Sequence, residues 1–230
     1  MVLPVRDSVR KRRYPWLTLT FIALNVAVFL VEASSGPMAH RLIGLLAVVP
    51  TDVLNPQVWA AEAGWPLVTL VSSTFLHGSW AHLLGNMLYL WIFGDNIEDL
   101  LGPGRYLLFY LLSGVLANVA HILANPVSGV PTIGASGAVA GVLGAYVFLF
   151  PRAKVLTLVP LGFVVPAIRV PAWLYLSFWF LTQLVSGLAP IWVREVTQNV
   201  AFWAHISGFL SGIALARLLR PTQRSPVPGR

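Results

Sequence analysis

Residues 77–99 read HGSWAHLLGNMLYLWIFGDNIED, an apolar run that is interrupted by His82 and Asn86 and followed by an acidic turn. His82 and Asn86 are four residues apart, so on a helix they share one face. Polar side chains are costly inside a membrane and are therefore candidates for a functional site. This stretch predicts a membrane-spanning helix from Trp80 to about Leu100 that carries polar groups on one face.

The rest of the chain is just as apolar. Of its 230 residues, 57% are hydrophobic and 10% are charged, whereas a soluble domain has about 25% charged residues. This composition argues against a soluble enzyme, a disordered protein and a secreted disulfide scaffold, and it favours a polytopic membrane protein. The chain contains no cysteine, which excludes thiolate metal sites and a cysteine nucleophile.

Six apolar runs approach the roughly 20 residues that a helix needs to cross a membrane. They are Trp16–Ala33, Trp80–Leu100, Tyr106–Leu123, Ser136–Phe150, Ala172–Leu188 and Ala201–Leu219. The sequence therefore predicts an all-α bundle of six transmembrane helices over residues 16–220. We expect a basic N-terminal tail at residues 1–15, an outside loop at residues 34–79 and a disordered C-terminal tail at residues 221–230.

The distribution of basic residues predicts the orientation of this bundle. If both termini are cytoplasmic, all of the 15 lysines and arginines except Arg41 and Arg194 lie on the cytoplasmic side, in agreement with the positive-inside rule. A nucleic-acid-binding patch is the competing interpretation of the net charge of +7. The cations lie on four separate segments, which favours the topological interpretation.

Four polar side chains fall at one predicted depth in the outer half of the bilayer: His82, Asn86, Ser136 and His205. Each lies about 20–25 Å from the cytoplasmic end of its helix, at 1.5 Å per residue. His121 and Gln183 are secondary candidates. The helix that begins at Ser136 is short, so the loop at residues 125–135 must dip into the membrane against protein or water. We therefore expect a wet cavity, open to the outside, with Ser136 at its floor.

These residue types suit acyl-transfer chemistry. A serine hydroxyl is a weak nucleophile until a base takes its proton, and histidine is the usual base. We interpret Ser136 as a nucleophile and His205 as its base, with His82 and Asn86 as donors to an oxyanion. Small residues let membrane helices approach closely, and the candidate packing residues are Gly134, Gly137, Gly141, Gly208 and Gly212.

Each feature by itself also has a purely structural interpretation. The small residues of 134–137 are common at helix contacts, and His82 and Asn86 could join two helices by hydrogen bonds. We interpret His77 as a structural or interfacial residue and His121 as a helix-joining or cavity-lining residue. The combination at one depth is more specific than any of its members.

Together these motifs resemble the rhomboid family of intramembrane serine proteases. The matching elements, in the family's order, are His-x4-His-x3-Asn at 77–86, the acidic turn with Gly-Pro-Gly-Arg at 94–105, Gly-Ala-Ser-Gly at 134–137 and Ala-His-x2-Gly-x3-Gly at 204–212. The resemblance implies a Ser136–His205 dyad and an oxyanion hole formed by His82, Asn86 and the backbone N–H of Ser136. The family needs no third acid, and we expect no acidic residue within any span at this depth.

The resemblance also implies the reaction and its setting. Such enzymes cleave transmembrane segments of other membrane proteins near their outer end, within the lipid bilayer and without metal, nucleotide or nucleic acid. We expect single-span or other membrane proteins as substrates. The absence of a further domain or a long leader favours a minimal bacterial or archaeal form in the cell (plasma or inner) membrane, with the active site open to the extracytoplasmic side.

Two positions depart from the family's pattern. Val68 and Thr69 occupy the place of a frequent Trp-Arg pair in the outside loop, and the nearest tryptophan is Trp65. Ala140 stands where members often have an aromatic residue that stacks on the base histidine. Another group must therefore orient His205.

The fifth span is predicted to be the movable side of the bundle. It carries four large aromatic residues, Trp173, Phe178, Trp179 and Phe180, and we expect it to act with the loop at residues 190–200 as a gate and lid.

Two other functions remain as alternatives. A catalytically inactive rhomboid-like protein could bind membrane clients, but such relatives lack the serine or the histidine, and both are present here. A small transporter or channel is also compatible with six spans and buried histidines, but the chain shows no internal repeat.

Overall fold

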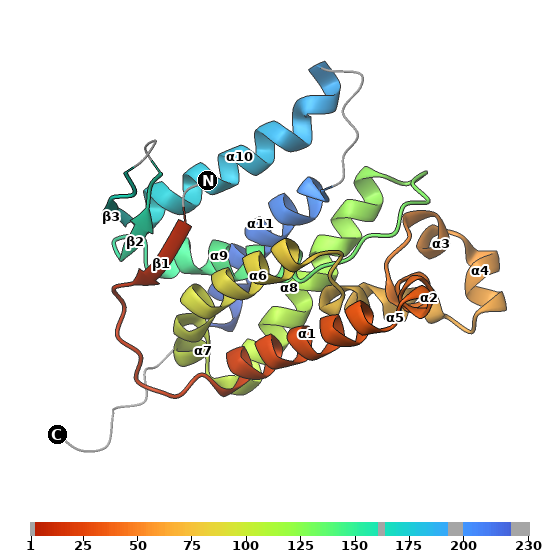
Figure 1. Cartoon of the computed structure of the whole chain (residues 1–230), viewed down its shortest axis with the longest axis horizontal. Helices are drawn as coiled ribbons and strands as arrows, with labels where there is room; N and C mark the ends of the chain where they lie inside the picture. The colour runs from red at the N-terminus through yellow and green to blue at the C-terminus, as the bar shows by residue number, and fades with distance from the viewer. Residues whose placement is uncertain (1–2, 161–163, 193–199, 222–230) are drawn as a thin grey trace.

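Apolar runs dominate the chain, and helices satisfy their backbone hydrogen bonds internally, as a membrane requires. The computed structural model describes residues 3–160, 164–192 and 200–221, without the side chains of 190–192. In this part of the chain, four helices are long and apolar enough to cross a membrane. They are α1 (Trp16–Ser34), α8 (Pro103–Ala124), α10 (Ala172–Trp192) and α11 (Phe202–Leu219). Figure 1 shows them beside one another in a bundle.

Two further apolar segments complete the bundle. Helix α9 (Ser136–Leu149) has 14 residues and is about 21 Å long at 1.5 Å per residue. The predicted second span forms α6 (Trp80–Tyr89), a π-helical turn η2 (Leu90–Gly94) and α7 (Asp95–Leu101). The structure thus has a helix at each of the six predicted runs, with ends that differ by only a few residues.

The prediction of an all-α fold is wrong in one respect, because a small antiparallel sheet is present. Its strands are β1 (Leu3–Asp7), β2 (Lys154–Leu158) and β3 (Ala167–Pro171), in the order β1-β2-β3. Strand β1 lies in the segment predicted as a basic tail and pairs with β2, about 150 residues away. Strands of five residues carry too little alternation to be recognised in the sequence. The end of the bundle that carries this sheet is called the sheet end below.

Short helices cover the opposite end of the bundle, called the loop end below (Figure 1). They are α2 (Pro37–Leu46), α3 (Pro50–Leu54), α4 (Pro56–Ala61), α5 (Trp65–Ser72) and the 3-10 turn η1 (Ser73–Phe75). Each of the helices α2 to α5 has a proline at N1 or N2. The N–H group that proline lacks would have no partner there, so its absence costs nothing.

The loop at residues 34–79 is anchored without a Trp-Arg pair. The indole nitrogen of Trp65 donates to the carbonyl oxygen of Leu45 at 2.6 Å. Val48 and Thr132 exchange two backbone hydrogen bonds, at 3.1 and 2.7 Å. The loop at residues 34–79 is therefore attached to the loop at residues 125–135, which leads into α9.

Helices α9 and α11 touch backbone to backbone. A Cβ atom on Gly208 would collide with the carbonyl oxygen of Gly137, and one on Gly212 would collide with that of Gly141. On its other side, a Cβ on Gly141 would lie 2.5 Å from the side chain of Ser113 in α8. The absence of side chains at these positions lets α9 lie between α8 and α11, with its first turn beside α11.

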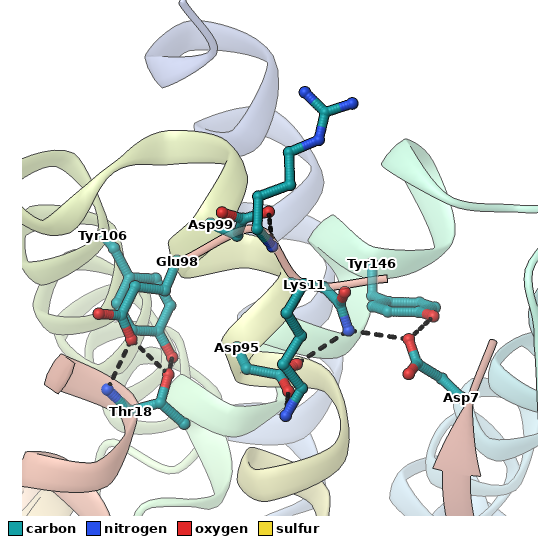
Figure 2. A network of polar contacts seen from close by, with 10 residues as sticks. Asp7, Lys11, Thr18, Asp95, Glu98, Asp99, Tyr106 and Tyr146 are labelled. Atoms are coloured by element: carbon teal, nitrogen blue, oxygen red, sulfur yellow. Dashed lines mark hydrogen bonds and ion pairs between the residues drawn. The ribbon is translucent and has the colours of Figure 1, made fainter. Parts of the chain in front are cut away.

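A carboxylate caps the first turn of α1 at the sheet end (Figure 2). Glu98 in α7 accepts hydrogen bonds from the backbone nitrogens of Leu17 and Thr18, at 2.9 and 2.8 Å, and from the Thr18 hydroxyl at 2.8 Å. The first N–H groups of a helix have no partner within it, and the helix dipole favours a negative charge there. Glu98 therefore joins α7 to α1.

A second group of contacts holds β1 against the bundle. Asp7 accepts hydrogen bonds from the side-chain amide of Asn96, at 2.8 Å, and from the Tyr146 hydroxyl. Lys11 forms an ion pair with Asp95. Figure 2 shows Asp7, Lys11, Asp95 and Tyr146 gathered between β1, α7 and α9. The N-terminal segment is thus attached to two helices of the bundle through polar contacts.

We expect Glu98→Ala to lower the free energy of unfolding by about 2–3 kcal/mol, because it leaves the helix N–H groups without a charged acceptor. Thermal or denaturant unfolding in detergent micelles measures this change. The matched control is Glu62→Ala, which removes an exposed carboxylate at the loop end and should stay within about 0.5 kcal/mol of wild type. Equal effects of the two substitutions would contradict the capping role.

Asp7 predicts a pH dependence of stability. Burial raises the pKa of the Asp7 carboxyl, against opposing contributions from Tyr146 and Lys11. The folded chain therefore holds this proton more tightly than the unfolded chain. The stability that the proton contributes is present below the unfolded pKa, near 4, and is lost as pH rises through the folded pKa.

Asp7→Asn keeps an acceptor oxygen for Asn96 and Tyr146 but carries no charge. Its stability relative to wild type should therefore increase as the pH is raised from about 4 to 7. Denaturant unfolding of both proteins across this range measures the difference. A difference that is constant or that falls with pH would refute the expectation.

Candidate functional site

A cavity of about 740 Å³ opens among α6, α8, α9, α10, α11 and the loop at residues 125–135. Its size falls within the usual range for small-molecule and substrate sites. Ser136, His205, His82 and Asn86 all line it. These four residues come from three helices, and the structure brings them together in one space.

Ser136 is the first residue of α9 and follows a turn that requires glycine. Gly134 has φ +125°, a conformation that favours glycine, and its backbone nitrogen donates to the carbonyl oxygen of Ser73 at 2.9 Å. A hydrogen bond at the start of the helix runs from Val139 N to Ala135 O. The N–H groups before Val139, including that of Ser136, lie in the first turn of the helix. They have no acceptor within the helix and are available to another group.

The ring of His82 packs against this turn. A Cβ atom on Gly134 would lie 2.6 Å from the Nε2 atom of His82 and 3.7 Å from the Oγ atom of Ser136. The backbone nitrogen of His82 donates to the Ser79 hydroxyl at 3.2 Å, which caps α6. The absence of a side chain at Gly134 therefore lets the His82 ring approach Ser136.

Asn86 is held by His77. The Asn86 side-chain amide contacts His77 Nε2 at 3.0 Å, and both residues are buried. Because an amide nitrogen can only donate, His77 Nε2 is the acceptor. One amide proton of Asn86 is used in this bond, and the second is left for a group in the cavity. The structural role that the sequence suggests for His77 therefore includes positioning Asn86.

An acidic residue that the sequence did not predict for the site lies beside His77. Glu32 in α1 is 6% exposed, and its carboxylate accepts a hydrogen bond from the backbone nitrogen of His77 at 3.1 Å. The expectation of no acidic residue at this depth is therefore wrong. A carboxylate inside the apolar run 16–33 is costly, and this cost was the signal that could have identified Glu32.

His205 is bound by Gln183, which the sequence marks only as a secondary candidate. The Nδ1 atom of His205 lies 2.8 Å from the Oε1 atom of Gln183 in α10. The ring also packs near Trp179, with 6.0 Å between ring centroids. Gln183 and Trp179 thus contact the histidine that has Ala140 in place of an aromatic neighbour.

His121 holds the loop that leads into α9. Its Nε2 atom lies 3.1 Å from the hydroxyl of Thr132, and both residues line the cavity. This contact attaches the loop to α8. His121 therefore agrees with the cavity-lining interpretation, and the partner that it joins to α8 is a loop rather than a helix.

Ser136 and His205 line one cavity but are not in direct contact. No hydrogen bond between them is found in the described part of the chain. Hydrogen bonds between catalytic groups are often long or poorly aligned without bound substrate, so the lack of this bond does not argue against the pair.

The four aromatic residues of α10 divide into two groups. Trp173 and Phe178 are more than half exposed and face away from the bundle, whereas Trp179 and Phe180 pack against Phe209 of α11. The predicted lid at residues 190–200 lies mostly outside the described residues, as does most of the predicted tail at 221–230.

The chain matches a family model described as the Rhomboid domain over residues 64–222. It is 33% identical to the rhomboid protease GluP of Bacillus subtilis over 136 residues, which are 59% of this chain and 25% of that protein. It is 32% identical to rhomboid protein 1, mitochondrial, of Saccharomyces cerevisiae over 201 residues, which are 86% of this chain and 51% of that protein.

A third relative is the chloroplastic rhomboid-like protein 11 of Arabidopsis thaliana, 35% identical over 154 residues, which are 65% of this chain and 51% of that protein. The chain thus spans between a quarter and about half of the length of these relatives.

Gly134→Ala should lower stability by roughly 1–3 kcal/mol, because a β-carbon strains the backbone there and displaces the ring of His82. The matched control is Gly129→Ala in the same loop, where a β-carbon would meet nothing within 4 Å. Unfolding in detergent micelles measures both. Equal stabilities of the two variants would show that the turn tolerates a side chain.

Proposed function

The chain belongs to the rhomboid family, and we propose that it is an intramembrane serine endopeptidase. It would hydrolyse a peptide bond near the outer end of transmembrane segments of other membrane proteins. The observation that carries this proposal is the shared cavity of Ser136, His205, His82 and Asn86 at the N-terminus of α9. The protease names of relatives such as the Bacillus subtilis protein support it.

The proposed reaction has two steps. The Oγ atom of Ser136 attacks the scissile carbonyl carbon while His205 takes the hydroxyl proton. His205 then gives this proton to the leaving amine, and an acyl-enzyme remains. A water molecule attacks the acyl carbon, His205 takes its proton, and the serine hydroxyl is restored as the new carboxyl terminus leaves.

The negative charge on the substrate oxygen would be stabilised by three donors. These are the free amide proton of Asn86, the ring of His82 and the backbone N–H of Ser136. Fixed donors of this kind contribute about 2.7–4 kcal/mol each to transition-state stabilisation. The packing of His82 on Gly134 and the bond from Asn86 to His77 keep two of these donors in place.

We propose the six-span topology with both termini in the cytoplasm. In this orientation the sheet end, with Arg6, Lys154 and Arg169, lies on the cytoplasmic side, and the cavity opens to the extracytoplasmic side. The protease domain then comprises residues 16–220, between the N-terminal segment 1–15 and the tail 221–230.

The family and the membrane-spanning helices indicate a multi-pass membrane protein. We propose that it resides in the cell (plasma or inner) membrane and acts on single-span or other membrane proteins. Two relatives carry mitochondrial and chloroplastic names, so fractionation of cells that produce the tagged chain is the measurement that assigns the membrane.

The second candidate is an inactive rhomboid-like protein that binds membrane clients. A fluorophosphonate probe separates the two functions, because it labels only an activated serine hydroxyl. Both Ser136 and His205 are present and line the same cavity, which favours the protease.

Ser136→Ala should abolish labelling and slow the cleavage of a reconstituted single-span substrate by at least about a thousandfold, because the covalent nucleophile is lost. The matched control is Ser34→Ala, which removes an exposed hydroxyl at the end of α1 and should leave both activities unchanged. Gel-based cleavage in proteoliposomes measures the rate. Wild-type rates in Ser136→Ala would refute the mechanism, and absence of labelling in the wild type would favour the inactive protein.

A further inference from the structure

We propose that Gln183 is the positioning residue that sets the tautomer of His205. The ability of His205 to accept a proton on Nε2 would then depend on the position of α10. The inference rests on the proposed roles of Ser136 and His205. It is carried by the hydrogen bond from His205 to Gln183 and by the packing of α10 on α11.

The orientation of the Gln183 amide follows from its own contacts. Its Nε2 atom donates to the Thr182 hydroxyl oxygen at 3.1 Å and lies 3.4 Å from the carbonyl oxygen of Trp179. The Thr182 hydroxyl donates its hydrogen bond to the same carbonyl oxygen, at 2.6 Å. Its oxygen must therefore accept the bond from the Gln183 amide. The amide nitrogen thus has its acceptors along α10, and Oε1 is the atom that faces His205.

This orientation determines where the imidazole proton lies. An amide oxygen accepts hydrogen bonds and cannot donate one. The 2.8 Å contact with Gln183 Oε1 therefore requires a proton on Nδ1 of His205. In a neutral ring, Nε2 is then unprotonated and can take the proton of the Ser136 hydroxyl.

The aromatic neighbours of His205 cannot determine which ring nitrogen carries the proton. Trp179 lies at 6.0 Å with the planes tilted by 37°, and Phe202 meets the ring edge-on at 6.2 Å and 88°. These rings limit how far the imidazole can rotate, but a hydrocarbon face offers no strong acceptor for an N–H group. Gln183 supplies the acceptor that the contacts with Trp179 and Phe202 lack.

The acceptor belongs to α10, which packs on α11 along one stripe. Trp179, Gln183 and Gly187 are spaced by four residues, and they meet Phe209, His205 and Phe202 of α11 in turn. The other face of α10 is directed away from the bundle, and Phe178 and Val185 there are 62% and 69% exposed.

Movement of α10 during cleavage would change the protonation of His205. The aromatic-rich α10 is predicted to be the movable side of the bundle, and any displacement from α11 separates Gln183 from His205. The histidine then loses its tautomer preference until α10 returns to its place. Loss of Gln183 should therefore affect the chemical step more than substrate binding.

The test measures the tautomer directly and does not depend on activity. The full chain is labelled with 15N-histidine in detergent micelles near pH 8, and the His205 resonances are identified by their loss in His205→Asn. We expect protonated Nδ1 and unprotonated Nε2 in the wild type. Gln183→Leu, which has similar volume and no acceptor, should give a mixture of tautomers.

Two variants serve as controls. Gln183→Glu keeps an acceptor oxygen in its ionised and neutral forms and should retain the wild-type tautomer. Val185→Ala changes the exposed face of the same helix turn and should behave as wild type. Thermal unfolding of each variant identifies any that fail to fold.

Kinetics with the reconstituted substrate give the second readout. Gln183→Leu should lower kcat about tenfold, the usual effect of losing one hydrogen bond, with KM within about twofold. Gln183→Glu should recover most of this loss, and Val185→Ala should show none.

A wild-type His205 with its proton on Nε2 would overturn the inference, as would a Gln183→Leu variant with unchanged tautomer and kcat. If wild-type Ser136 proves unreactive toward the fluorophosphonate while Gln183→Leu still shifts the tautomer, the proposed protease function fails and the positioning role of Gln183 stands.

Discussion

The backbone contact between α9 and α11 is the constraint on which the site depends. Gly208 and Gly212 of α11 lie against the carbonyl oxygens of Gly137 and Gly141, with no space for a β-carbon. In a membrane, where lipid is as apolar as the helices, close packing is a principal source of helix association. The contact places the N-terminus of α9, and with it Ser136, beside the turn of α11 that carries His205. A larger residue in this seam would separate the two.

The ends of the bundle are held by different kinds of interaction. At the sheet end, Glu98 and Asp7 accept hydrogen bonds from α1, α7 and α9, in a region where backbone groups would otherwise lack partners. At the loop end, the Val48–Thr132 pairing and the contact of Thr132 with His121 hold the loop before α9. The short α9 is thus held at both ends by contacts with other elements.

The helical segments could be predicted because long apolar runs have few alternatives in a membrane. Ser136, His205, His82 and Asn86 were recognisable since polar groups are conspicuous in such runs. The sheet was not predictable, because β1 and β2 are short and come from opposite parts of the chain. Glu32 was overlooked although its charge stands in an apolar run, and Gln183 gave only a weak signal.

Composition and residue spacing were sufficient to predict a membrane protein, its approximate helices and the candidate site residues. Apolar length and the spacing of polar residues are local properties, so they can be read along the chain. Which atoms come into contact could be learned only from the folded chain. That Asn86 is held by His77, and that Gln183 accepts from His205, depends on the rotation and packing of α6, α10 and α11. These rotations follow from the contacts of whole helices, and no local pattern encodes them.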